Sequence, residues 1–327
     1  MTTTRWGILG TGRIAGTFAA DLRHAPGAEL AAVGSRSLDT AKAFAAEHDA
    51  ARAHGSYAEL AANPDVDVIY VATPHTAHYD ATMACLAAGK PVLCEKPMTL
   101  ELATSAQLVD VARAGRTFLM EAMWMRCNPA IRKIHELLRA GTIGDIVALN
   151  ADLGLQGPFE ATHRLRNPAL GGGALLDLGV YLIHLAHLFL GTPSTVQSTA
   201  QLTSEGVDET TGILLGYHPR AIAALTCSIA GATRNGASIT GTRGRIDLPA
   251  GFYAPPSFVL HSSSSSTSFD FPFEGSGYQF EAIEVQRCLA EGLVESPLVP
   301  HLATLEVMTM LDTVRAEIGV AYPDSPS

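Results

Sequence analysis

Short runs of apolar residues alternate with helical patterns along the first third of the chain. The apolar runs predict buried strands, which we place at residues 5–9, 29–35, 66–72, 91–94 and 117–121. Stretches with a helical period lie at residues 13–22, 37–48, 79–88 and 102–114. Because strands that alternate with helices of this length form βαβ units, we expect a parallel sheet in this part of the chain.

The pattern changes between residues 121 and 128. Helices are expected at residues 129–140, 175–190, 278–291 and 302–319, and strands at 146–153, 196–202, 212–217, 221–229, 237–240, 245–248 and 257–261. Consecutive strands joined by short glycine-bearing turns indicate a mostly antiparallel sheet. The serine run at residues 262–266 is interpreted as a solvated loop. The fold class is therefore α/β, with a first domain at residues 1–123 and a second, α+β domain at 124–327 that contains a large, open-faced sheet.

Composition and charge narrow the classes of function. With 327 residues, 47% of them hydrophobic, the chain is long enough for two domains. Its net charge of −10 opposes the phosphate backbone of nucleic acids, so no nucleic-acid partner is expected. A small anionic cofactor can still bind, because it needs only a local group of amides and a cation.

Neither a membrane span nor a metal site is expected. The apolar stretch at residues 174–190 is short and contains Asp177, His184 and His187. The chain starts without a basic, signal-like region. The five cysteines are scattered, which is typical of free thiols in a reducing cytoplasm and does not suggest zinc: Cys85, Cys94, Cys127, Cys227 and Cys288.

A glycine-rich turn follows the first predicted strand. Gly10, Gly12 and Ala15 form a GxGxxA motif between this strand and a helix that begins at Arg13 and Ile14. Gly10 permits the tight turn, Gly12 lets the backbone approach a pyrophosphate, and the helix N-terminus supplies N–H groups to the anion. This context predicts a Rossmann dinucleotide-binding domain.

The end of the second predicted strand indicates which dinucleotide binds. NAD-specific sites usually carry an acid here, but this chain has Ser35, Arg36 and Ser37. Arg36 can pair with a 2′-phosphate, and the two serines can donate hydrogen bonds to it. We therefore expect NADP(H). The alternative is that Arg36 stacks on the adenine or faces solvent.

Two further segments carry candidate catalytic groups. Glu95 and Lys96 end a predicted strand, where ligands collect in open α/β sheets, although a lysine there is equally compatible with a surface charge. Asp177 and Tyr181 are four residues apart on a predicted helix, so they share a face. Taken alone, Tyr181 is more simply explained as a packed tyrosine bonded to Asp177. An ammonium such as that of Lys96 would favour the phenolate form.

These motifs together resemble the glucose–fructose oxidoreductase / inositol dehydrogenase (Gfo/Idh/MocA) family. The resemblance rests on the GxGxxA turn, the strings AGKPVLCEKP and GGGALLDLGVY, and the late GYQFEAIEV. Within the family, FLMEAMWMRCNP and SITGTRGRIDL are similar to the branch of dimeric dihydrodiol dehydrogenase and NADP-linked aldose (xylose) dehydrogenases. His184 stands where most inositol-type members carry an acid, which argues against an inositol-like pocket.

The resemblance implies roles for individual residues. Lys96 would contact the substrate hydroxyl and the nicotinamide region, and Tyr181, with Asp177, would be the acid/base. Cofactor contacts are implied for Ala72, Thr73, Pro74, His75, His78, Glu95, Trp124 and Arg126. Trp124 and Tyr181 join Lys96 as candidate substrate residues. Arg164 is a further candidate from its position just ahead of the triple glycine, although that position is nearly as compatible with a solvated loop residue. The resemblance also implies a small sugar or cyclic diol substrate and a homodimer joined through the C-terminal sheet, whose exposed face predicts an interface.

The mechanism expected from these residues is an NADP(H)-dependent oxidation of a CH–OH group. Tyr181 would accept the hydroxyl proton while a hydride leaves the adjacent carbon, and Lys96 would stabilise the alkoxide. Two alternatives stay open. One is a catalytically silent NADP(H)-binding sensor, because a fold does not determine chemistry. The other is a family member with different NAD-dependent chemistry, such as glycosidic cleavage.

Overall fold

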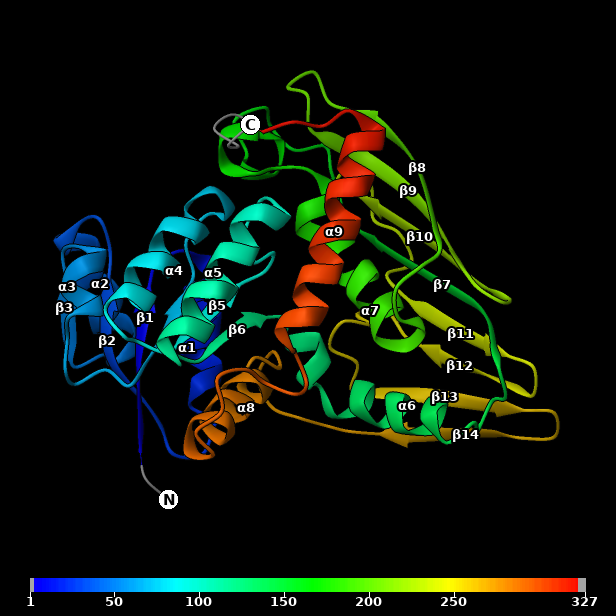
Figure 1. Ribbon diagram of the computed structural model, residues 1–327, viewed down its shortest axis with the longest axis horizontal. Coiled ribbons are helices and arrows are strands. Elements are labelled where there is room, and N and C mark those ends of the chain that lie inside the picture. Colours follow the sequence, from blue (N-terminus) through cyan, green and yellow to red (C-terminus); the bar gives the residue numbers. More distant parts are fainter. Residues whose placement is uncertain (1–2, 323–327) are drawn as a thin grey trace. The chain divides into compact units, whose positions relative to one another are not determined.

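The computed structural model describes residues 3–322, which divide into two compact units (Figure 1). The first unit contains the chain up to Cys127 together with Glu274–Leu305, and the second contains Asn128–Phe273 and the chain from Glu306 onward. This division differs from a single boundary at residues 123/124, because residues 274–305 return to the first unit. There the buried Asp21 carboxylate accepts the backbone N–H groups of Ser276 and Tyr278 at 2.9 Å.

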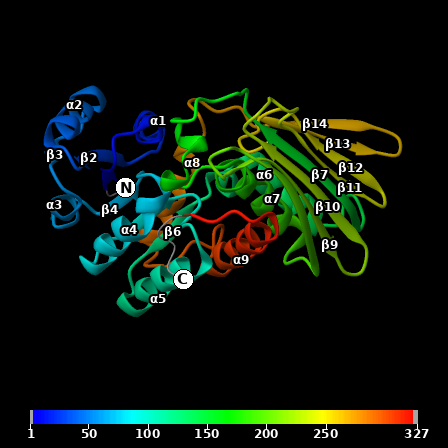
Figure 2. The same ribbon diagram turned by 90° about the horizontal axis from the view of Figure 1, so that it is seen from above.

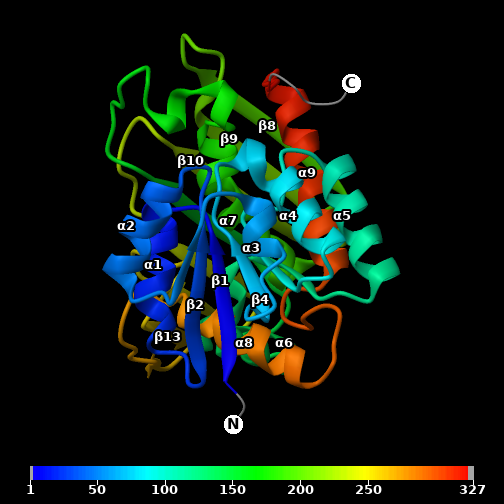
Figure 3. The same ribbon diagram turned by 90° about the vertical axis from the view of Figure 1, so that its left-hand side faces the viewer.

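The first unit is built on a six-stranded parallel sheet with the order β3-β2-β1-β4-β5-β6. Its strands are β1 (Thr4–Leu9), β2 (Ala28–Gly34), β3 (Arg52–His54), β4 (Val68–Val71), β5 (Val92–Glu95) and β6 (Leu119–Ala122). Its helices are α1 (Arg13–Leu22), α2 (Leu38–His48), α3 (Tyr57–Ala61), α4 (His78–Ala87), α5 (Leu102–Gly115) and α8 (Gln279–Ala290). Helix α1 contacts α2 and α8, whereas α4 contacts α3 and α5, so two helical layers flank the sheet (Figure 3).

Burial on both faces explains why the strands of this sheet read as continuous apolar runs. All residues of β4, β5 and β6 are buried. The parallel sheet and its strand–helix alternation are confirmed. Strand β3 and helix α3 escaped the sequence pattern, since they are only three and five residues long.

The second unit contains an eight-stranded sheet with the order β14-β13-β12-β11-β7-β10-β9-β8. Every pair is antiparallel except β7 with β10. Its strands are β7 (Ile146–Gly154), β8 (Thr195–Leu202), β9 (Asp208–Tyr217), β10 (Ala221–Ser228), β11 (Ala237–Gly241), β12 (Gly244–Leu248), β13 (Ser257–Ser262) and β14 (Ser266–Asp270). The expected mostly antiparallel sheet is confirmed. The loop expected at residues 262–266 is shorter than predicted, because Ser262 ends β13 and Ser266 begins β14.

Helices cover one face of this sheet (Figure 2). They are α6 (Pro129–Arg139) and α7 (Val180–Leu190), and α9 (His301–Ile318) runs through the unit boundary at Leu305. Helix α7 is preceded by a π-helical turn at Leu175–Gly179. Among the described residues, one helical stretch, Pro168–Leu190, is long and apolar enough to cross a membrane, but 83% of its apolar window is buried, as in a core helix. Among residues 3–322, no helix covers the opposite face of the sheet, which we call the bare face (Figure 2).

Candidate active site

The glycine turn lies at the carboxyl end of β1. Gly10 has φ +111°, and a Cβ on it would lie 2.5 Å from the carbonyl oxygen of Ala72, so only glycine fits between the ends of β1 and β4. Gly12 is the N-cap of α1, and a Cβ there would meet nothing within 4 Å. The first turn of α1, with Arg13 and Ile14, contains no acidic side chain. A helix N-terminus without a side-chain cap or an acidic first turn favours an anion such as a pyrophosphate.

The segment after β2 is compatible with a 2′-phosphate. Arg36 is exposed, and it stands between Ser35 and Ser37 in the turn that leads into α2. The Ser37 hydroxyl caps α2 by accepting the N–H of Thr40 at 3.4 Å. Arg36 and its two flanking serines therefore follow the end of β2, the strand next to β1, which leads into the glycine turn.

The loop after β4 carries the next group of predicted residues. Pro74 is exposed, His75 begins a 3₁₀ turn, and Thr73 and Ala72 are buried. His78 is fully buried, and its two ring nitrogens face the carbonyl oxygens of Pro97 at 2.8 Å and Thr73 at 2.9 Å. Burial lowers the pKa of the His78 imidazole. His78 thus joins the β4 loop to the turn that follows β5.

That turn contains Glu95 and Lys96, and the Lys96–Pro97 peptide is cis. The Glu95 carboxylate is turned into the core, where it accepts the Tyr70 hydroxyl at 2.5 Å and the Lys96 N–H at 3.1 Å. Lys96 is 9% exposed. Burial raises the pKa of Tyr70 well above its ordinary value, and the charge of Glu95 adds to this shift.

Trp124 and Arg126 follow β6 in a buried 3₁₀ turn. The Trp124 ring stacks on Tyr278, with ring centroids 4.2 Å apart and an interplanar angle of 25°. The sequence patterns did not single out Tyr278, because it comes from the distant segment that returns to the first unit. Its position at the start of the late GYQFEAIEV string was the available signal.

In the second unit, Asp177 lies in the π-helical turn and Tyr181 in the first turn of α7. Such π-helical segments occur frequently at functional sites. Both Asp177 oxygens accept hydrogen bonds from the Arg164 guanidinium, at 3.0 and 3.2 Å. The Tyr181 ring, 7% exposed, packs against Tyr253 with centroids 5.4 Å apart. Tyr253 is a second aromatic neighbour that the sequence analysis missed.

The triple glycine places Arg164 and the helix start close together. A Cβ on Gly172 would lie 2.7 Å from the Arg164 carbonyl oxygen, and one on Gly173 would meet an Asp208 oxygen. The buried Asp208 carboxylate accepts the Leu175 N–H at 2.7 Å, so it anchors the turn that carries Asp177. The glycines therefore serve close backbone packing around this anchor.

The structure places the predicted residues in two groups, one in each unit. The nucleotide candidates follow the carboxyl ends of β1, β2, β4, β5 and β6, and Arg164, Asp177 and Tyr181 lie together in the second unit. His184 is fully buried in α7. Among residues 3–322, no group of three or more His, Cys, Asp or Glu side chains is arranged to hold a metal ion.

Comparison with known proteins agrees with this arrangement. Residues 4–122 match the model of the oxidoreductase family with an NAD-binding Rossmann fold (GFO/IDH/MocA). Residues 131–247 match the model of the GFO/IDH/MocA C-terminal domain. Together the two models account for most of both sheets.

Curated relatives cover the whole length. The chain is 38% identical to a trans-1,2-dihydrobenzene-1,2-diol dehydrogenase of Xenopus laevis, over 98% of this chain and 99% of the relative. It is 39% identical to the protein of that name from Macaca fascicularis, over 98% of both.

Solved structures also resemble this chain over nearly its whole length. A 3-ketoreductase of Actinomadura kijaniata, in complex with NADP and TDP-benzene, superposes with a TM-score of 0.85 at 28% identity, over 97% of this chain and 98% of that one. An aldose-aldose oxidoreductase of Caulobacter crescentus has a TM-score of 0.86 at 21% identity, over 96% and 97% of the chains, which shows a shared fold.

Proposed function

Because this chain belongs to the GFO/IDH/MocA oxidoreductase family, we propose that it is an NADP(H)-dependent oxidoreductase acting on the CH–OH or carbonyl carbon of a sugar or cyclic diol. The observation that carries the proposal is the complete set of reactive groups. A glycine turn, Arg36 and the buried Lys96 follow strand ends of the first unit, and Asp177 and Tyr181 lie four residues apart around the start of α7 in the second unit.

The cofactor is proposed to lie along the carboxyl edge of the parallel sheet. The N-terminus of α1 would hold the pyrophosphate, and Arg36 with its flanking serines would hold the 2′-phosphate. The residues assigned to the cofactor are Gly10, Gly12, Arg13, Ile14, Ser35, Arg36, Ser37, Ala72, Thr73, Pro74, His75, His78, Glu95, Lys96, Trp124 and Arg126. The crystallised 3-ketoreductase contains NADP, which supports this choice. When bound, the nicotinamide supplies the hydride acceptor or donor.

Tyr181 is proposed as the acid/base. In oxidation its phenolate oxygen accepts the proton of the substrate hydroxyl, and in reduction its hydroxyl returns a proton to the carbonyl oxygen. The Lys96 ammonium stabilises the oxygen of the substrate as negative charge develops there. Such an arrangement needs no metal ion, because the ammonium provides the positive charge.

Asp177 is proposed to orient these groups, and its own geometry is fixed by Arg164. The two-pronged guanidinium contact holds the carboxylate in one plane. Arg164 is also more than half exposed, with 57% of its side chain accessible, so it can line the substrate cleft. The relatives named as dihydrodiol dehydrogenases and the aldose-aldose oxidoreductase support a small hydroxylated substrate.

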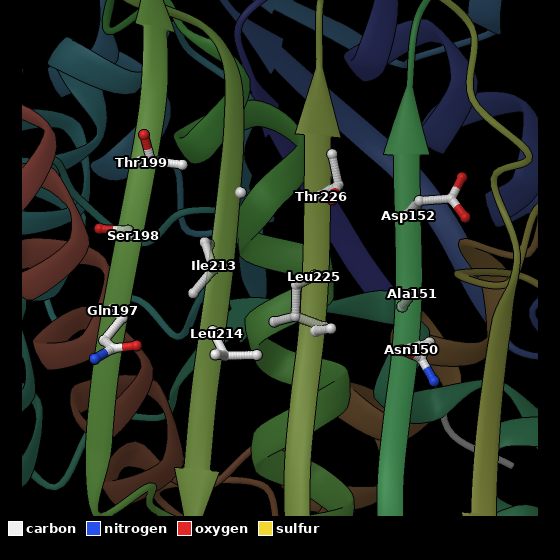
Figure 4. A pocket seen from close by; sticks show the side chains of 12 residues that line it. Asn150, Ala151, Asp152, Gln197, Ser198, Thr199, Ile213, Leu214, Leu225 and Thr226 are labelled. Atoms are coloured by element: carbon white, nitrogen blue, oxygen red, sulfur yellow. The ribbon is translucent and has the colours of Figure 1, made fainter.

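We further propose that the bare face of the second sheet joins two copies of the chain. The face carries a shallow hollow of about 560 Å³, whose lining comes from β7, β8, β9 and β10 (Figure 4). Leu214 and Ile222 are 44% and 51% exposed on it, and their neighbours are small, such as Ala224 and Gly212. Polar side chains also line the hollow, namely Asn150, Gln197 and the charged Asp152. An exposed face that combines apolar and hydrogen-bonding side chains suits a self-complementary interface. The scattered cysteines, all buried as free thiols, support a cytoplasmic location.

The test is a set of initial rates with NADP⁺ and with NAD⁺ across aldoses and trans-dihydrodiols. Turnover with NADP⁺ well above that with NAD⁺ supports the proposal, and the best substrate assigns the class. If neither cofactor supports oxidation and NADPH supports no carbonyl reduction, the silent sensor becomes the better interpretation. Release of a glycosidic leaving group would instead support the alternative chemistry.

A further inference from the structure

Two buried carboxyl groups bind the backbone on either side of Lys96. Glu95 Oε2 accepts the N–H of Lys96, and Glu121 Oε1 accepts the N–H of Met98, both at 3.1 Å. The two glutamates are 5% and 1% exposed. The turn that carries Lys96 is therefore bracketed by hydrogen bonds from the protein interior.

Each of these carboxyl groups is itself fixed. The Tyr70 hydroxyl donates to Glu95 Oε1 at 2.5 Å, and the Thr304 hydroxyl donates to Glu121 Oε2 at 2.9 Å. Glu95 ends β5, and Glu121 lies on the neighbouring strand β6, paired with Cys94. The two acceptor carboxylates therefore reach the same turn from adjacent strands. The hydroxyl groups that donate to them come from Tyr70 on β4 and Thr304 on α9.

Folding alone does not explain two carboxyl groups at these positions. Burying polar groups costs free energy that hydrogen bonds only offset, and apolar residues of similar size often serve a core equally well. The neighbouring strand positions Leu93, Leu119 and Met120 are apolar and fully buried. The carboxyl groups of Glu95 and Glu121 are therefore better explained by their hydrogen bonds to the Lys96 turn than by the packing of the sheet.

We propose that Glu121 is a positioning residue of the active site, which with Glu95 fixes the backbone from Lys96 to Met98 and thereby aims the Lys96 ammonium. This inference rests on the role of Lys96 in the proposed function. A lysine side chain is long and flexible, so its placement depends on how firmly its backbone is held. Small displacements of a catalytic group lower turnover more than they lower binding.

The kinetic experiment compares Glu121→Gln and Thr304→Val with the unchanged protein. We expect Glu121→Gln to lower kcat by about tenfold or more, with the KM for NADP⁺ unchanged. The carboxylate accepts both the Met98 N–H and the Thr304 hydroxyl, whereas an amide has one acceptor oxygen and presents a donor in place of the other. Thr304→Val keeps the carboxyl group and removes only its hydroxyl donor, so a smaller fall in the same direction is expected. This milder variant keeps the test usable if Glu121→Gln does not fold.

The matched control is Glu284→Gln. Glu284 is also a buried carboxyl group of the first unit, 6% exposed, but it accepts from Ser296 and Arg287 and makes no contact with the Lys96 turn in the described residues. It should lower the melting temperature and leave kcat unchanged. Equal losses of kcat in Glu121→Gln and Glu284→Gln would mean a general loss of stability and would overturn the inference.

A second readout does not depend on turnover. Lysines labelled as ¹³C-dimethyl-lysine give separate methyl resonances, and the signal of Lys96 is assigned by its loss in Lys96→Met. We expect Glu121→Gln to shift the Lys96 resonance and to leave those of Lys42 and Lys133 in place. An unmoved Lys96 resonance contradicts the inference even if no substrate is found. Loss of activity in Lys96→Met would confirm the underlying role separately.

Discussion

The two sheets of this protein differ in how much of their surface the helices cover. In the parallel sheet, β4, β5 and β6 are buried at every residue. In the second sheet, buried and exposed residues alternate along β10, with Ile222 51% exposed on the bare face. The first sheet has no free face among the described residues, whereas the second has one.

This difference decides where chemistry and association can occur. With both faces covered, the parallel sheet offers ligands only its carboxyl edge, where Gly10, Arg36, Thr73 and Lys96 lie. The second sheet has an entire face available for a partner, and its candidate reactive groups lie on the helix and loop of the covered face. The comparison predicts that substitutions at strand ends change catalysis, and that substitutions on the bare face change assembly.

The largest effect is expected at the glycine turn. Gly12→Val should leave the melting temperature nearly unchanged, because a Cβ there meets no atom within 4 Å. The new side chain would occupy the space proposed for the pyrophosphate, so the Kd for NADPH should rise by roughly 100-fold or more, about 2.8 kcal/mol. Fluorescence titration with NADPH measures it. An unchanged Kd would mean that the cofactor does not bind at this strand end, and it would contradict the assignment of ligand binding to the carboxyl edge of the parallel sheet.

A smaller effect is expected beside it. Arg36→Ala should raise the KM for NADP⁺ by about tenfold or more and leave that for NAD⁺ unchanged, because a charged hydrogen-bonded contact contributes about 1.5–3 kcal/mol. Arg23→Ala, an exposed arginine at the far end of α1, is the control. If both cofactors respond equally to Arg36→Ala, the guanidinium does not contact the 2′-phosphate.

The bare face gives the next prediction. Ile222→Lys should weaken a homodimer by about tenfold or more, since a buried polar group without a partner costs on the order of 1–3 kcal/mol and a charged group costs more. Analytical ultracentrifugation measures the dissociation. Leu302→Lys is the matched control, because Leu302 is 62% exposed but belongs to the first unit. A monomeric parent protein would remove the interface proposal.

The smallest expected effect concerns a buried acid in the first unit. Burial raises the pKa of Glu281 well above 4.5, and the charges of Glu95 and Asp21 raise it further. The folded protein therefore keeps this proton to a higher pH than the unfolded chain does. The raised pKa of Glu281 therefore stabilises the folded state fully below pH 4.5, and this contribution is lost as the pH rises through the raised pKa.

Glu281→Gln removes this dependence, because the amide is neutral at every pH. We expect its unfolding free energy to fall less than that of the parent protein as the pH rises, by up to about 1.4 kcal/mol for each pH unit within the affected range. Calorimetry across that range measures the difference. The exposed Glu160→Gln should follow the parent protein, and a Glu281→Gln curve parallel to the parent's would contradict the assignment.

The sequence predicted the elements whose pattern is long and periodic. The parallel strands, the glycine turn and the long antiparallel strands were recognisable because burial imposes a regular alternation of residue types. Strand β3 and helix α3 are too short for a period, and β14 was hidden by the serine run. The return of residues 274–305 to the first unit depends on the Asp21 contact, which joins residues more than 250 positions apart.

The candidate site shows the same limit. Lys96, Asp177 and Tyr181 were suggested by their positions on elements and by family resemblance. The side-chain contacts that hold them were not suggested. Arg164 reaches Asp177 from a 3₁₀ turn, Glu121 on β6 accepts the Met98 N–H, and Thr304 on α9 donates to Glu121. Side-chain contacts between distant segments leave no periodic pattern in a single sequence.

The central claim is that Tyr181 transfers the proton in an NADP(H)-dependent hydride transfer. Its most direct test is the kcat of Tyr181→Phe with the best substrate of the panel, measured together with the Kd for NADPH. The account predicts a fall in kcat on the order of 10²-fold or more at unchanged NADPH affinity, because the ring is kept and only the hydroxyl is lost. A variant that turns over at a near-normal rate would contradict it.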